Sequence, residues 1–140
     1  MKMPDKLDDD LRLAIMRLAR RIRQERLDDT PSDSQLSVLY ALTHYGELSL
    51  AALSEHERVT PPSMNHTVNC LTDDGLVTRT KSTDDGRKVL IDVTEAGAAL
   101  VTKTRERRAA WFAAELGTLS PEERAAVDAA LPVLMKLANS

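Results

Sequence analysis

The apolar pattern of residues 59–93 constrains the fold of this chain most, because it changes from helical to alternating at Gly75. A helix is predicted to begin at Thr60-Pro61, where a side-chain cap precedes a proline in the first helical position. Apolar residues at i, i+4 and i+7 mark its buried face: Met64, Val68 and Leu71. The β-branched runs Val77–Thr80 and Val89–Val93 then predict two strands, joined by turn-forming residues.

Helices are predicted on both sides of this segment. Ser32 and Gln35 form a capping-box signature for one of them, and Ser120-Pro121 opens another. Pro132 is expected to kink that last helix or end it early. The other predicted helices cover residues 8–27, 32–45, 50–57, 60–74 and 95–116.

The predicted fold is therefore mainly α with a small β-hairpin, a winged helix-turn-helix. Residues 32–94 would form the DNA-binding lobe. The first helix has only a narrow apolar stripe, suited to pairing with a helix of a second subunit. We therefore assign residues 1–31 and 95–140 to a helical dimerisation region.

Composition narrows the class of protein. The net charge of −3 argues weakly against a nucleic-acid binder, but the arginines and lysines are unevenly spread. One cysteine, no signal-peptide pattern and no membrane-spanning apolar run indicate the cytoplasm and no membrane partner. No phosphate loop, nucleophile elbow or HExxH motif indicates an enzyme, and no cofactor is expected.

A predicted helix followed by a hairpin indicates binding to double-stranded DNA, since one helix fits the major groove. Arg87 at the tip of the hairpin, or wing, could enter the neighbouring minor groove, whose negative potential attracts a guanidinium. Asp85 could hold Arg87 extended through a charge-assisted bond. The other candidate DNA-binding residues are polar groups of the predicted recognition helix and nearby cations: Thr60, Pro62, Ser63, Asn65, His66, Asn69, Arg58, Arg79 and Lys81.

Several motifs in order resemble the MarR family of bacterial regulators. They are Ser34-Gln35-Leu36, Val59 to Met64, Leu71 to Val77, Asp84 to Lys88 and Val93 to Gly97. The resemblance implies a homodimer, joined by its terminal helices, that binds palindromic DNA and usually represses transcription. It also implies release of DNA when a small phenolic or anionic ligand enters a crevice beside the DNA-binding lobe.

The recognition helix departs from the family pattern, because His66 stands where a basic residue is common and no Lys or Arg lies between Arg58 and Arg79. The alternative is a winged-helix dimer that has lost specific DNA binding and serves as a protein-interaction or small-molecule-binding module. The arginines of residues 12–26 are read as a solvated face rather than a DNA contact.

Tyr40 and His44 lie four residues apart and are candidate ligand-binding residues at the crevice, although Tyr40 also suits the core. Trp111 lines either the same crevice or the dimer interface. His66 and Cys70 share a helix face, but no further ligands are evident, so no metal site is predicted.

Overall fold

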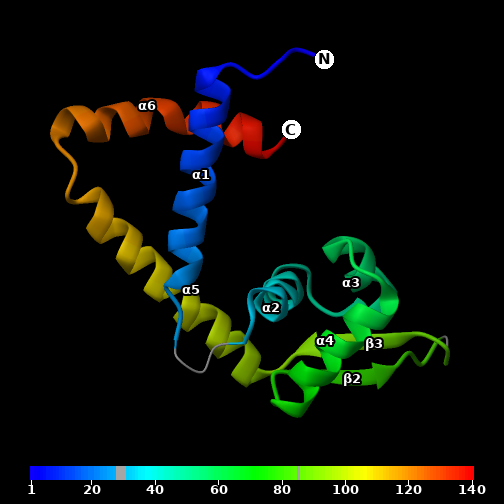
Figure 1. The fold of residues 1–140 in the computed structure, drawn as a ribbon. Coiled ribbons are helices and arrows are strands. Elements are labelled where there is room, and N and C mark those ends of the chain that lie inside the picture. Colours follow the sequence, from blue (N-terminus) through cyan, green and yellow to red (C-terminus); the bar gives the residue numbers. More distant parts are fainter. Residues whose placement is uncertain (28–30, 85) are drawn as a thin grey trace.

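The computed structural model describes residues 1–27, 31–84 and 86–140. These residues are mostly helical and include one small sheet. The elements are α1 (Lys6–Gln24), α2 (Asp33–Tyr45), β1 (Leu48–Ser49), α3 (Leu50–Glu57), α4 (Pro61–Asp73), β2 (Val77–Lys81), β3 (Val89–Val93), α5 (Glu95–Leu116) and α6 (Pro121–Ala138). Figure 1 shows α2, α3, α4 and the hairpin gathered at one end, with α1, α5 and α6 extending away.

The helix starts follow from local hydrogen bonds that the sequence encodes. Ser32 accepts from the backbone of Gln35, whose side chain accepts from the backbone of Ser32, so the predicted capping box is confirmed. Ser120 and Glu123 make the same pair at α6. The predicted start of α4 at Pro61, behind the cap residue Thr60, is also confirmed.

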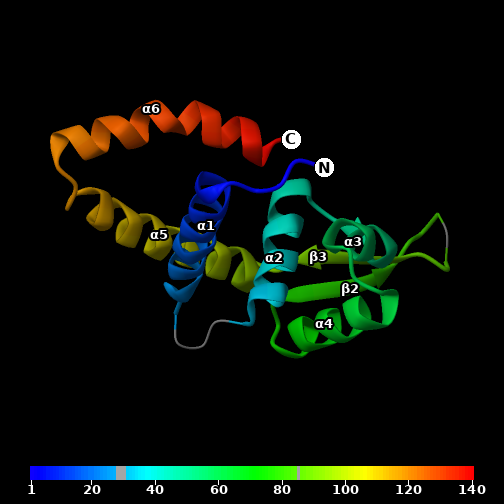
Figure 2. The same cartoon turned by 45° about the horizontal axis from the view of Figure 1, so that its top comes forward.

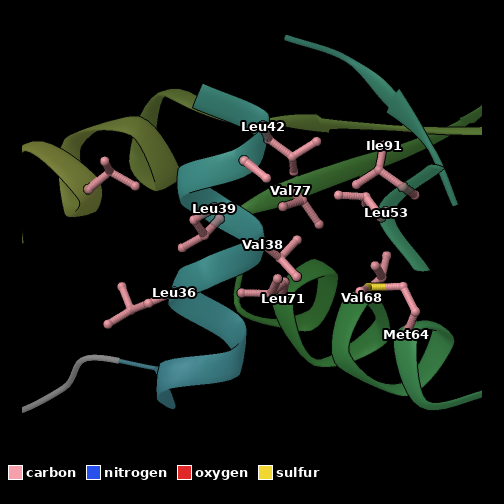
Figure 3. Packing of buried hydrophobic residues seen from close by; sticks show 12 residues of the cluster. Leu36, Val38, Leu39, Leu42, Leu53, Met64, Val68, Leu71, Val77 and Ile91 are labelled. Atoms are coloured by element: carbon pink, nitrogen blue, oxygen red, sulfur yellow. The ribbon is translucent and has the colours of Figure 1, made fainter. Parts of the chain in front are cut away.

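The hydrophobic core lies between α2, α3, α4 and the sheet, with one contribution from α5 (Figure 3). The predicted inner face of α4 is confirmed, since Met64, Val68 and Leu71 are buried. Burying these side chains fixes the orientation of α4, so its opposite face must point to solvent. The rest of the core consists of Leu36, Val38, Leu39, Ala41, Leu42, Leu53, Val77, Ile91 and Val101.

The sheet has three antiparallel strands in the order β1-β3-β2. Val77 pairs with Val93 and Lys81 with Val89, so the predicted hairpin is confirmed. The two-residue strand β1 was not predicted, because two residues show no alternation. Leu48 pairs with Ile91 and thereby ties the α2–α3 connection to the hairpin.

The helices α1 and α6 leave the core and contribute no buried residue. In Figures 1 and 2, α5 runs outward from the sheet and α1 crosses α5. The chain turns back at the far end of α5 and continues as α6. Apolar side chains on both helices are exposed, among them Ile15 and Leu131, which are 44% and 54% exposed. No helix of the described residues is long and apolar enough to cross a membrane.

Both predicted ends of the first helix were wrong. The first helix begins at Lys6 rather than residue 8, because Asp5 and Asp8 form a capping box with aspartate in the place of glutamate. It ends at Gln24 rather than residue 27. Of the two outcomes expected of Pro132, a kink or an early end, the early end is wrong, because α6 continues to Ala138. An exposed helix tolerates the lost backbone donor better than a buried one, because water can bond the freed carbonyl.

Candidate nucleic-acid interface

The helix α4 presents a polar face directly opposite its buried face. Thr60, Pro62, Ser63, His66 and Asn69 are exposed, and Asn65 is half-buried. The structure therefore places all six predicted recognition-helix residues on or at the edge of one accessible surface. A face of this kind, at the start of a helix, is where side chains reach base edges in a major groove.

The first turn of α4 is held by its own side chains. Thr60 Oγ1 accepts from the backbone nitrogen of Ser63 at 3.3 Å and donates to Ser63 Oγ at 3.1 Å. Thr67 donates to the carbonyl of Ser63 at 3.2 Å. This turn offers no free backbone N–H group, because Pro61 and Pro62 carry none and the amides of Ser63 and Met64 donate to Thr60. The helix dipole still favours a phosphate beside it.

Arg79 connects the hairpin to the recognition helix. Its Nη2 donates to Asn65 Oδ1 at 3.1 Å and to Asn69 Oδ1 at 2.9 Å. The two asparagines lie one helical turn apart on α4, and Arg79 lies on β2. A positive charge from the strand thus lies on the helix that itself has no lysine or arginine.

The hairpin extends past α3 and α4 (Figure 2). Lys81 and Arg87 are exposed on it, as a DNA contact requires. A groove of about 500 Å³ separates the hairpin from the starts of α3 and α4, and Pro61, Arg87 and Lys88 are among its lining residues. The predicted partner of Arg87, Asp85, lies outside the described residues.

Arg58 lies in the turn between α3 and α4. It is exposed and adopts a left-handed backbone conformation, with φ 55° and ψ 43°, as the C-cap of α3. The left-handed conformation is unfavourable for a residue with a Cβ atom. The turn therefore sets the position from which the Arg58 side chain extends, at the end of α3 next to α4.

His66 and Cys70 share a face of α4 as predicted, with Nε2 and Sγ 3.8 Å apart. Within the described ranges, no group of three or more His, Cys, Asp or Glu side chains could hold a metal ion. The pair is accounted for by its mutual contact on the helix surface.

Two of the three candidate ligand-binding residues, Tyr40 of α2 and Trp111 of α5, contact arginine side chains. Tyr40 Oη accepts from Arg108 Nη1 at 3.4 Å, and the guanidinium of Arg105 lies 4.9 Å from the centre of its ring. Trp111 lies under Arg21 of α1, at 4.8 Å. Both aromatic rings therefore face cations close to where α1, α2 and α5 meet.

The third candidate, His44, lies one helical turn beyond Tyr40 on α2. It is exposed at the end of α2, where its ring contacts Tyr45, which in turn contacts His56 of α3. Arg105 and Arg108, which the sequence analysis did not single out, contact Tyr40. The sequence signalled these arginines only as charges on a helix and gave no indication of their partners.

Comparisons with known proteins agree with this geometry. The family model "MarR family" matches residues 32–89. The uncharacterized HTH-type transcriptional regulator Mb0904 of Mycobacterium bovis is 40% identical over 134 residues, which cover 96% of this chain and 94% of that protein.

Solved structures show the same fold. A transcriptional regulator from Pseudomonas aeruginosa superposes with a TM-score of 0.85 at 28% identity, covering 96% of both chains. BpsR of Bordetella bronchiseptica, whose DNA binding is regulated by 6-hydroxynicotinic acid, superposes with a TM-score of 0.68 at 25% identity. The match covers 96% of this chain and 99% of BpsR.

Proposed function

Because the chain belongs to the MarR family of transcriptional regulators, we propose that it is a homodimeric repressor that binds a palindromic DNA operator and responds to a small ligand. One observation carries the proposal. The polar face of α4 is accessible, and a groove at the start of this helix is lined by the exposed cations Arg87 and Lys88 of the hairpin. This arrangement fits a helix in the major groove and a wing beside it. The proposal places the protein in the cytoplasm, with its DNA.

The dimer is supported by the apolar residues of α1 and α6. These helices contribute nothing to the core, yet each exposes a row of large apolar side chains. Exposed apolar area of this extent is typical of an interface rather than of a monomer surface. We therefore assign residues 1–31 and 95–140 to dimerisation and residues 32–94 to DNA binding.

The ligand is proposed to be anionic and aromatic. Arg105 lies over the ring of Tyr40 and Arg21 over the ring of Trp111, while Arg108 donates to the Tyr40 hydroxyl. Arginine binds carboxylates through paired donors and stacks on aromatic faces. Trp111 is the only tryptophan of the chain, so quenching of its fluorescence by 6-hydroxynicotinic acid tests this part directly.

DNA binding is tested by titrating the protein against the duplex upstream of its own gene, at two salt concentrations, beside an unrelated duplex. The proposal predicts a clear preference for the upstream duplex and an affinity that falls as salt rises. Equal, weak binding to both duplexes would contradict it and favour the alternative, a winged-helix dimer acting as an interaction module.

A further inference from the structure

The contact between Arg79 and the two asparagines of α4 has a consequence for base recognition, and it rests on the proposed function. A guanidinium carries five N–H donors and no acceptor. The amide atoms that face Arg79 at 3.1 and 2.9 Å must therefore be the oxygens of Asn65 and Asn69. The orientation of both amides is fixed by chemistry, and each NH₂ group is directed away from Arg79.

We propose that Arg79 is a specificity-determining residue that converts Asn65 and Asn69 into donor-only groups, which select guanine over adenine. An asparagine usually reads adenine with both ends of its amide, since the oxygen accepts from N6 and the nitrogen donates to N7. Here each oxygen already accepts a charge-assisted bond. Guanine presents two acceptors in the major groove, O6 and N7, and suits a donor-only surface.

The second lone pair of each amide oxygen does not restore adenine reading. A donor at that position, such as the N6 amino group, would carry its partial positive charge towards the guanidinium. The repulsion is strengthened once DNA excludes water from the interface. Cytosine is disfavoured for the same reason, because its major-groove edge presents only an amino group.

Arg79 acts here through the asparagines as a positioning residue. Both bonds come from Nη2, and Nη1 and Nε donate to no acceptor among the described residues. Those two nitrogens can still donate to a phosphate, so the loss of Arg79 would lower affinity in any case. Affinity alone therefore does not test the proposal, and the readout must be base preference.

The test selects bound duplexes from a library with a random core and compares variants. Asn65→Ala and Asn69→Ala identify the base positions concerned, because preference disappears only there. At these positions the wild type should select guanine about tenfold over adenine. In Arg79→Met the amides are free to rotate, and adenine should rise to at least equal frequency.

Two further variants complete the test. Lys81→Met removes a neighbouring cation of β2 and should lower affinity without changing base preference. Arg79→Lys retains a donor-only cation and should retain guanine, a prediction that holds even if Arg79→Met does not fold. Unchanged preference in a folded Arg79→Met, or adenine selected by the wild type or by Arg79→Lys, would overturn the proposal. Failure of the wild type to enrich any sequence would instead overturn the proposed function on which it rests.

Discussion

Arg108 Nε lies 3.2 Å from the main-chain oxygen of Glu25, although 83 positions separate the two residues. The same side chain donates from Nη2 to the carbonyl of Arg23 at 3.2 Å. Carbonyls at the end of a helix lack partners within it, and a positive charge there also complements the helix dipole. Arg108 therefore connects α5 to the end of α1, while its contact with Tyr40 reaches α2.

Replacing Arg108 should loosen this junction. We expect Arg108→Ala to lower the free energy of unfolding by about 2 kcal/mol, because hydrogen bonds to a charged group are lost and helix-end carbonyls lose a partner. Denaturant unfolding measures the change. Arg107→Ala is the matched control, since its contact with Glu25 is a surface ion pair at 3.8 Å. That variant should stay within about 0.5 kcal/mol of wild type, and equal losses in both variants would contradict the assignment.

Gly97 fixes how closely α5 approaches the sheet. A Cβ atom at this position would meet the carbonyl of Leu76 and lie 2.7 Å from Val93 Cγ2. Gly97→Ala should therefore destabilise the protein by about 1–3 kcal/mol, as overpacking does. At Gly86 an added Cβ atom would meet no atom of the described residues within 4 Å, so Gly86→Ala should be nearly neutral. Thermal unfolding measures the stability of both variants. A neutral Gly97→Ala would show that α5 can move away from Leu76 freely.

A charge within the exposed apolar row of α6 should weaken the proposed dimer. We expect Leu131→Glu to raise the dimer dissociation constant by roughly tenfold or more, because an interface buries such a charge without a partner. Sedimentation velocity across a range of concentrations reports it. Lys136→Glu changes a charged residue of the same helix and should leave association nearly unchanged. If both variants sediment as the wild type does, α6 is not part of the interface.

The wing, which is the hairpin of β2 and β3, is expected to contact DNA through Arg87. Arg87→Ala should lower affinity for the operator about tenfold, since one guanidinium contact with DNA is lost. The slope of the logarithm of the binding constant against the logarithm of the salt concentration should become shallower by about one unit. Fluorescence anisotropy at several salt concentrations measures both quantities. Lys103→Ala removes an exposed charge from α5, away from the hairpin, and should change neither. Wild-type affinity of the Arg87→Ala variant would show that the wing does not contact DNA through Arg87.

The sequence predicted those parts of the fold that depend on neighbouring residues. Ser32 with Gln35, Thr60 before Pro61, and the alternation of Val89–Val93 act within a few positions, so their outcomes follow from pattern. The exposed face of α4 was predictable for the same reason, because a buried stripe at helical spacing defines its opposite face.

Contacts between distant segments were not predictable in this way. Arg79, Asn65 and Asn69 were each predicted as candidate DNA-binding residues, without any contact between them. Their hydrogen bonds depend on how the hairpin packs against α4, which no local pattern encodes. The role of Arg108 at the end of α1 was missed because a helical arginine carries no signal of a partner so far away in the chain.

The central claim is that two copies of α4 enter successive major grooves on one face of an operator. Hydroxyl-radical footprinting on the duplex upstream of the gene measures this directly. Two protected blocks should appear on one face of the duplex, related by a dyad and centred about 34 Å apart. A single protected block, or uniform protection without a boundary, would contradict the claim.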